Sequence, residues 1–118
     1  MVEALESTEA SVVASFALAG GALTAKYEDG ATGRLSGALD APRTARALAV
    51  GRRLRSLAEE LDTTPARLGL AFALANPGVA SVLFGATSAA QVADDVGAVE
   101  VAARLSADEL ARLRELAR

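Results

Sequence analysis

The main feature in the pattern of hydrophobic and polar positions is a long stretch without any charged residue, residues 68–93. A run of 26 residues is long enough to cross a membrane. Asn76, Pro77 and Gly78 interrupt it, however, and proline ends a helix because it lacks an amide hydrogen and clashes with the preceding turn. The pattern therefore predicts an apolar helix, a turn, a buried strand at residues 81–84 and the start of another helix, and no membrane span.

The N-terminal segments predict one strand and a long loop. Residues 1–11 are compatible with the end of a helix that carries glutamates on one side. Residues 11–16, SVVASF, are rich in β-branched side chains and too short for an ordinary helix, so we predict a buried strand. The glycines at positions 20 and 21 indicate a sharp turn or, less commonly, a close approach of backbone to a ligand. Residues 25–41 contain further glycines among scattered charges and predict a long loop.

Two helices are predicted before the second strand. Over residues 42–61, apolar residues recur at spacings of three and four, and Pro42 stands in the first turn, where its missing donor costs nothing. Thr64 followed by Pro65 is typical of the N-cap and first position of the next helix. Its apolar residues from 68 to 75 lie on more than one face, so we expect this helix to be covered nearly all round and to be the surface most in need of a partner.

Two more helices are predicted after the second strand. Thr87 or Ser88 caps the next helix, and residues 91–101 carry that helix and its exit. Ser106 and Glu109 have the spacing of a capping box, which opens a final amphipathic helix. The order is therefore strand, long loop, two helices, strand and two helices.

This order predicts a single helix-rich α/β domain that covers residues 1–118 and is incomplete. Two parallel strands cannot close a barrel, and each exposed sheet edge leaves backbone donors and acceptors unpaired. Symmetric self-association is the ordinary way to bury such surface, so we expect a homo-oligomer, either a dimer or a tetramer. An alternative is an all-α helical bundle in which the short strands do not pair.

Composition narrows the class of function. The net charge of -3 and the isoelectric point near 4.9 provide no excess of positive charge for a nucleic-acid backbone, so no nucleic acid is expected as a partner. The chain has no cysteine and no histidine, which excludes disulfides and thiolate metal sites, predicts no metal, and removes the commonest general base at neutral pH. The absence of cysteine is typical of the reducing cytoplasm, where we expect the protein.

Three motifs occur in an order and a spacing that are known from one family. They are SFALAGGALTAKY at residues 15–27, AEELDTTPARLGLAFALANPGVASVLFGATSAAQVADDVGA at residues 58–98 and LSADELARLREL at residues 105–116. They resemble the C-terminal part of the aldo-keto reductases, in the branch that includes the potassium-channel beta subunits and related bacterial oxidoreductases. The resemblance begins near Val12 and implies a partial (βα)8 (TIM) barrel, the last two strand-helix units plus the two extra helices that decorate it.

The resemblance implies a chemistry that this chain does not complete. In the family, hydride passes from NADPH to a carbonyl while a tyrosine delivers the proton, helped by lysine, aspartate and usually histidine. Those catalytic residues lie in the half of the barrel that this chain lacks, and Tyr27, the one tyrosine, matches a loop motif. We therefore expect a truncated aldo-keto reductase that carries no catalytic residues and is not competent alone.

The resemblance also implies part of a site for NADP(H). Lys26 would supply positive charge to the pyrophosphate, and Arg34 would approach the adenosine phosphate. The motif after the second strand would bind the adenosine end at a helix N-terminus, where backbone amides favour a phosphate. The residues that match the family's cofactor motifs are Leu18, Gly20, Lys26, Arg34, Gly85, Thr87, Ser88, Gln91, Asp94 and Asp95.

Four residues depart from the family's pattern. Phe16 and Ala17 replace a serine and a proline, which removes a hydroxyl from the cofactor wall, although Phe16 can serve by packing. Ala25 replaces a glycine, so the loop must differ if that position needs a positive φ. Asp95 replaces an asparagine and brings a negative charge near an anionic ligand.

The sequence is consistent with three functions. The first is a self-associating fragment whose parent reduced carbonyl compounds with NADPH. The second is a residual NADP(H)-binding module that uses Lys26, Arg34, Thr87 and Gln91. The third is a helical protein-interaction domain built on the all-α arrangement.

Overall fold

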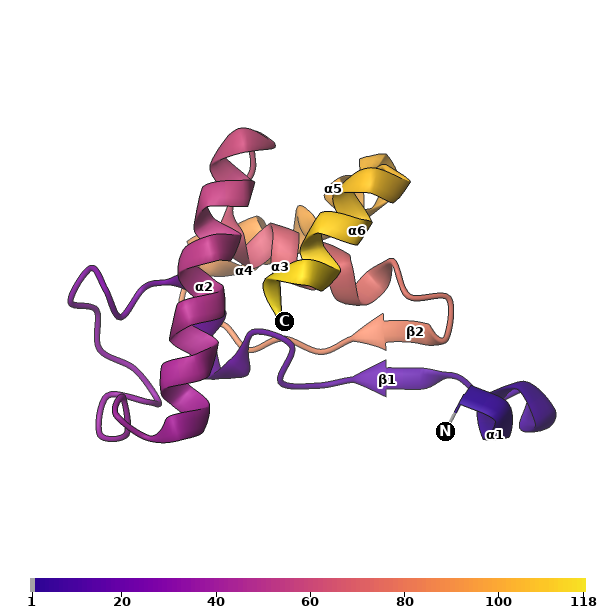
Figure 1. The fold of residues 1–118 in the computed structure, drawn as a ribbon, viewed down its shortest axis with the longest axis horizontal. Helices are drawn as coiled ribbons and strands as arrows, with labels where there is room; N and C mark the ends of the chain where they lie inside the picture. The colour runs from indigo at the N-terminus through magenta and orange to yellow at the C-terminus, as the bar shows by residue number, and fades with distance from the viewer. Residues whose placement is uncertain (1) are drawn as a thin grey trace.

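Six α-helices, one 3-10 helix and two short strands make up residues 2–118, which are the residues that the computed structural model describes (Figure 1). In chain order they are α1 (Val2–Thr8), β1 (Val12–Ala14), η1 (Ala19–Thr24), α2 (Pro42–Glu60), α3 (Pro65–Leu74), β2 (Val79–Val82), α4 (Ala89–Val96), α5 (Ala98–Arg104) and α6 (Ala107–Leu116). Residues 25–41 form turns and irregular chain, which confirms the predicted long loop. Met1 of the predicted N-terminal lead lies outside the described residues.

The two strands pair in parallel and form a two-stranded sheet. The register places Ala14 opposite Val82. This pairing makes the fold helix-rich α/β, compatible with part of a (βα)8 barrel, and the alternative of an all-α bundle with unpaired strands is wrong. Both strands differ from their predicted bounds, because β1 is shorter than residues 11–16 and β2 begins two residues before the predicted 81–84.

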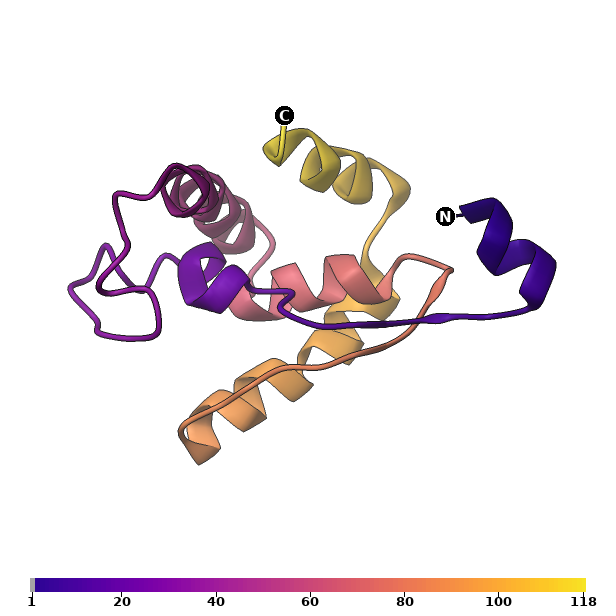
Figure 2. The same ribbon diagram turned by 90° about the horizontal axis from the view of Figure 1, so that it is seen from below.

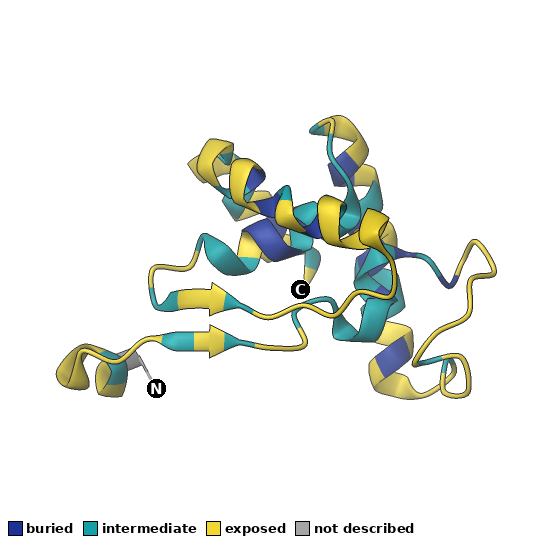
Figure 3. Ribbon diagram, turned by 180° about the vertical axis from the view of Figure 1, so that it is seen from behind, coloured by how far each residue is buried: buried dark blue, intermediate teal, exposed yellow. Residues whose placement is uncertain are grey.

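The strands lie at the surface, which corrects the prediction that they are buried. Val13 of β1 is 58% exposed, and Leu83, which follows β2, is 56% exposed. Figure 3 shows both strands in the colours of exposed and intermediate residues. Apolar β-branched sequence predicts burial only when further layers cover both faces of a sheet. Within residues 2–118 the core is instead built between helices.

The core lies where α2, α3, α5 and α6 meet. Its buried residues are Leu54, Leu57, Ala58, Leu68, Leu70, Ala71, Ala98, Val101 and Leu113. Small and aliphatic side chains fill it throughout, as the low aromatic content requires. Each helix therefore approaches its neighbours closely.

Helix α3 is the central element of this core, and it contacts η1, α2, β2, α4 and α5 (Figure 2). Leu68 and Ala71 are fully buried, and Leu70 is nearly so. Elements of the same chain thus cover most of this helix, as predicted, and the expectation that it is the surface most in need of an external partner stays a prediction. Its uncovered part is narrow and centres on Phe72, which is 36% exposed.

Local capping chemistry sets most of the helix starts, as the sequence predicts. Pro42 stands at the first turn of α2, and the Thr64 side chain accepts a hydrogen bond from the Arg67 amide at the start of α3. Ser106 and Glu109 form a complete capping box at α6. These interactions involve residues within one turn of each other, so they need no tertiary contact.

Residues 91–101, predicted to carry one helix and its exit, belong to two helices, α4 and α5. The N-cap of α4 is Ser88, whose side chain accepts from the Gln91 amide, so Ser88 rather than Thr87 is the capping residue. The helical structure is interrupted at Gly97, which lies between α4 and α5. This break depends on a contact with α3 that local sequence does not reveal.

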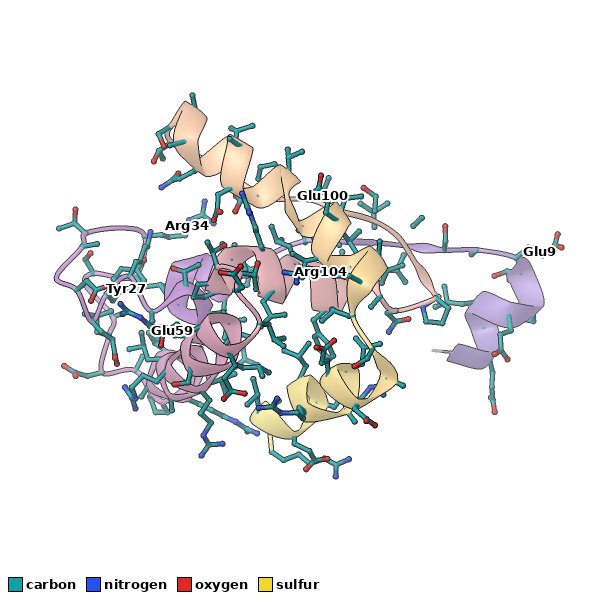
Figure 4. All side chains as sticks on the ribbon, turned by 90° about the horizontal axis from the view of Figure 1, so that it is seen from above. Glu9, Tyr27, Arg34, Glu59, Glu100 and Arg104 are labelled. Carbon is teal, nitrogen blue, oxygen red and sulfur yellow. The ribbon has the colours of Figure 1, made fainter. Side chains whose placement is uncertain are left out.

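Helix α1 lies beyond the N-terminal end of β1, apart from the helical core (Figures 1 and 2). Glu9, just after this helix, lies at the opposite end of the molecule from Tyr27 and Arg34 (Figure 4). Among the helices of residues 2–118, none combines the length and the apolar character that a membrane span needs.

Candidate functional site

Both strands run in the same direction, so their carboxyl ends open at the same end of the sheet (Figure 1). η1 and the long loop follow β1, and residues 83–88 lead from β2 to α4. The carboxyl ends of parallel strands are where α/β proteins bind ligands. The predicted cofactor residues follow these two strand ends, in one group from Leu18 to Arg34 and a second from Gly85 to Asp95.

Tyr27 organises the first group. Its buried hydroxyl donates to the Gly20 carbonyl oxygen at 2.9 Å and accepts from the Leu35 amide at 3.1 Å. It thereby joins η1 to the far part of the loop. Tyr27 has a structural role here, and its hydroxyl is already engaged on both sides.

Lys26 lies beside Tyr27 in a notch lined by two glycines. Its Nζ is 5.0 Å from the centre of the Tyr27 ring, within range of a cation-π interaction. A methyl group added at Gly21 would lie 2.5 Å from Lys26 Cε, and one added at Gly33 would lie 2.7 Å from Nζ. The end of the Lys26 side chain therefore occupies space that a side chain at Gly21 or Gly33 would fill.

Two ion pairs connect the loop to α2. Arg52 bonds Glu28 at 2.5 Å, and Arg55 bonds Asp29 at 3.1 Å. Because all four side chains are at least partly exposed, each pair adds little stability by itself. The pairs hold the chain just after Lys26 against α2, while Arg34 lies exposed on the same loop (Figure 4).

Three non-glycine residues around η1 have a left-handed backbone. Phe16, Ala19 and Ala25 have φ of 60°, 49° and 58°, and the intervening Gly20 and Gly21 are also positive. Strained backbone of this kind concentrates at functional sites and persists only where surrounding structure enforces it. Phe16 is 60% exposed, so packing against the chain, proposed above for its side chain, is not observed.

Ala25 allows a direct test of this strain. Its methyl group is fully buried, yet its φ of 58° favours glycine. We expect Ala25→Gly to raise the free energy of unfolding by about 0.5–1 kcal/mol. A left-handed backbone costs a residue with a Cβ about 1–2 kcal/mol, and glycine removes this cost, but the loss of the buried methyl group cancels part of the gain. Urea unfolding would measure the change.

Ala22→Gly is the matched control for this substitution. Ala22 is also fully buried in η1, but its φ is not positive. It should lose stability by about 1 kcal/mol, since glycine there gains no strain relief and adds backbone freedom. Equal destabilisation by the two variants would show that the backbone at Ala25 is unstrained.

The second group lies at the N-terminus of α4. The Gln91 side-chain oxygen accepts from the Thr87 amide at 2.7 Å and from the Thr87 hydroxyl at 3.1 Å, while Ser88 caps the Gln91 amide. This reciprocal arrangement leaves the Gln91 side-chain nitrogen as the group's outward donor. The amides of Ala89 and Ala90 make no hydrogen bond among residues 2–118, so they can donate to an anion.

Asp94 and Asp95 are engaged inside the structure. Asp94 forms an ion pair with Arg67 at 3.0 Å and accepts from the Thr64 hydroxyl at 2.9 Å. Asp95 is 7% exposed, and burial, together with the charge of Asp94, raises the pKa of its carboxyl group. Neither carboxylate is part of the open N-terminus of α4.

The raised pKa of Asp95 predicts how stability depends on pH. The folded state binds this proton more tightly than the unfolded state, so stability increases as the pH falls through the folded pKa and is lowest above it. Asp95→Asn should therefore raise the melting temperature at neutral pH, with a gain that shrinks towards acidic pH.

Asp40→Asn, in the exposed loop, is the control for this prediction and should give little change. The measurement is the melting temperature of each variant across an acidic to neutral pH series. A gain for Asp95→Asn that is constant over the series would contradict the assigned cause.

The structure thus builds the two groups separately, and no hydrogen bond joins them within residues 2–118. Two hollows in the described residues lie elsewhere. One of about 400 Å³ lies between α2 and α6 around Arg53 and Arg112, and another of about 300 Å³ lies between α3 and α6 around Phe72 and Leu110. Neither hollow is lined by a predicted cofactor residue.

The sequence did not reveal the roles of two residues in this region. Tyr27 matches the loop motif, but its buried double hydrogen bond depends on the loop returning at Leu35. Arg67 stands beside a recognised N-cap, but its partner is 27 positions later. Around Arg67, the sequence alone indicated only the N-cap at Thr64.

These features define a helix-rich α/β protein built from parallel strand-helix units with polar groups at the strand ends. The sequence model of the Aldo/keto reductase family matches residues 1–118, and the chain belongs to this family. It is 34% identical over 108 residues to the Schizosaccharomyces pombe (strain 972 / ATCC 24843) protein named "Putative voltage-gated potassium channel subunit beta". That match covers 84% of this chain and 31% of the relative, so the chain spans about a third of the length of the curated relative it matches.

Proposed function

We propose that this chain contributes the phosphate and adenosine part of an NADP(H) site in an aldo/keto reductase that reduces carbonyl compounds. The observation that supports this most directly is the Lys26 ammonium, held in its glycine notch at the carboxyl end of β1. A fixed cation with few protein partners at a strand end is suited to a phosphate. Bound NADPH would supply the hydride, while this chain's residues bind and orient the cofactor.

The residues present fit an anionic dinucleotide at two places. Lys26 offers the charge, and the amides of Ala89 and Ala90 with the Ser88 cap offer a helix N-terminus. Asp95 does not oppose this fit directly, because its carboxyl group is buried and is not part of the open N-terminus of α4. Arg34 is exposed on the loop and can reach an incoming phosphate.

We further propose that these 118 residues do not catalyse the reaction by themselves. By resemblance, the family's proton-donating tyrosine and its helpers have no match here. The hydroxyl of Tyr27 is engaged with Gly20 and Leu35, so it cannot substitute for that donor without breaking the loop. Carbonyl reduction would require residues from outside this sequence.

A titration of the chain with NADPH, followed by the fluorescence of the cofactor, tests the proposed binding. Lys26→Ala should weaken binding by about tenfold or more, since a charge-assisted hydrogen bond contributes about 1.5–3 kcal/mol. Arg43→Ala removes an exposed positive charge from α2 and is the control, expected to change affinity little. Equal weakening by both variants, or no response of the wild-type chain to millimolar NADPH, would contradict the proposal.

Self-association is the second part of the proposal. The sheet has two strands, so each has an outer edge without a strand partner within residues 2–118. Val13 of β1, Leu83 just after β2 and Val96 of α4 are each more than half exposed. Pairing between copies, as a dimer or a tetramer, would cover such edges.

Sedimentation velocity over a range of concentrations tests this association. Leu83→Lys should shift the wild-type oligomer to a monomer, because a charge would then stand in the buried contact. Ala103→Lys, on the exposed side of α5, is the control and should leave the mass unchanged. A compact, stable wild-type monomer at every concentration would contradict self-association.

A further inference from the structure

A cluster of polar side chains connects the start of α3 to the second turn of α4. The Thr64 hydroxyl accepts from the Arg67 amide at 3.2 Å and donates to Asp94 Oδ2 at 2.9 Å. Arg67 Nε donates to the Asp94 backbone carbonyl at 2.9 Å and lies 3.0 Å from Asp94 Oδ1. Asp94 is therefore held at both its backbone and its side chain. We call Thr64, Arg67 and Asp94 the α3–α4 clasp.

Gly97 makes room for the clasp. A methyl group added there would lie 2.5 Å from Arg67 Nε and 2.7 Å from Arg67 Cζ. The guanidinium thus occupies the space that a side chain at the break between α4 and α5 would take. The position of the break and the position of Arg67 depend on each other.

The clasp matters because apolar packing holds α4 only weakly. Val92 and Val96 of α4 are 45% and 57% exposed, so the helix presents much of its apolar side to solvent (Figure 3). Asp95 is its buried residue. With few buried apolar contacts, the direction in which α4 points depends strongly on the bonds made by Asp94.

That direction determines where the N-terminus of α4 lies. Ser88 and the amides of Ala89 and Ala90 stand at the other end of the same short helix, less than two turns from Asp94. A tilt of α4 about the clasp would move these donors relative to the end of β2. A mispositioned donor loses most of its contribution to binding, since hydrogen bonds weaken steeply with angle and distance.

We propose that Arg67 is a positioning residue of the nucleotide site, that it acts through Asp94, and that Asp94 is part of the clasp and does not contact the nucleotide. This inference rests on the proposed binding of NADP(H). It changes the role that the family motif implies for Asp94 and gives Arg67 and Thr64 a role in the same site.

A double-mutant cycle on nucleotide affinity tests the inference. The variants are Arg67→Ala, Asp94→Ala and the two combined, each titrated with NADPH by fluorescence. Each single variant should weaken binding by about fivefold to tenfold, and the combined variant should be no weaker than either one, because residues that act as a unit do not add. Hydrogen exchange of the Gln91 and Val92 amides, which are bonded to Ser88, should be faster without nucleotide in all three variants.

Arg104→Ala is the matched control. Arg104 also joins a helix to a distant backbone carbonyl, donating to Leu61 at 3.2 Å, but it connects α5 to the end of α2. It should lower the melting temperature about as much as Arg67→Ala, and it should leave NADPH affinity and the exchange of the Gln91 and Val92 amides unchanged. Loss of affinity in this control would show that general destabilisation explains the effect.

The outcomes separate this inference from the proposed function. If wild-type chain binds NADPH and Arg67→Ala binds it equally well, the positioning role is wrong and the cofactor proposal stands. If the two single effects add, Asp94 contacts the nucleotide directly. If Arg67→Ala weakens binding far more than Asp94→Ala, Arg67 itself contacts the nucleotide. If the wild-type chain does not respond to NADPH, the proposed function fails and the inference fails with it.

Discussion

Gly51→Val is expected to lower the free energy of unfolding by about 3 kcal/mol, at the upper end of what overpacking costs. Gly51 is the point where α2 crosses η1. A Cβ there would lie 3.2 Å from Leu23 Cα and closer still to the Ala22 carbonyl oxygen. Both are backbone atoms, so relief requires the whole of η1 to move away from α2. Urea unfolding at one fixed protein concentration would measure the loss.

The control compares alanine at Gly51 with alanine at a second helix glycine, Gly69. Gly69 in α3 also lies in a helix and against other residues, but its nearest neighbours are the ends of the flexible Leu18 and Leu54 side chains. Replacing a helix glycine by alanine gains about 1 kcal/mol of helix propensity in either place. We therefore expect Gly69→Ala to be neutral or slightly stabilising and Gly51→Ala to be clearly destabilising. Similar effects for the two would mean that α2 and η1 can separate at little cost.

Leu68→Ala has the other large expected effect, a loss of about 3–4 kcal/mol, because it removes a wholly buried side chain and leaves a cavity. Leu68 is the largest fully buried side chain among the described residues, and it lies in α3 at the centre of the core. A domain with an Ala- and Leu-rich core has few large side chains to close the gap. We expect a broad, early thermal transition.

Phe72→Ala in the same helix is the control. Phenylalanine is the larger side chain, but Phe72 is 36% exposed, so its truncation should cost about 1–2 kcal/mol by the area it buries. The same urea unfolding experiment compares the two variants. A greater loss at Phe72 than at Leu68 would show that the exposed side of α3 is covered in solution, as self-association would do.

The helix starts were predictable because their chemistry is local. Pro42, Thr64 and Ser106 each act on residues one turn away, and the structure has each helix starting where these residues predict. The choice between Thr87 and Ser88 was not predictable, because both can cap. In the structure the Ser88 hydroxyl accepts from the Gln91 amide and is the N-cap, while the Thr87 amide and hydroxyl donate to the Gln91 side chain.

The strands show where sequence patterns were insufficient. Their β-branched composition predicted strands correctly but also predicted burial, and Val13 and Leu83 are exposed. Burial is a property of the elements that pack on a strand, and a strand's own sequence does not reveal whether they are present. The break of the predicted 91–101 helix at Gly97 has the same origin, since Arg67 from α3 occupies the space beside it.

The candidate site was predictable as a set of residues but not as an arrangement. Lys26 and Ser88 were identified from motifs, and they lie at the ends of neighbouring parallel strands. The roles of Tyr27, Arg67 and Asp94 depend on contacts over 7 to 30 positions. Such contacts exist only once the loop and the helices have packed.

By itself, the sequence determined the kinds of elements, most of their starts, the family and the residues that match its cofactor motifs. Each of these follows from interactions within a few residues or from direct similarity. The tertiary structure alone decided that the core lies between helices, that Ala25 takes a left-handed backbone, and that Asp94 belongs to the clasp. Those features depend on which surfaces meet, and the free energy of that packing is shared among residues far apart in the chain.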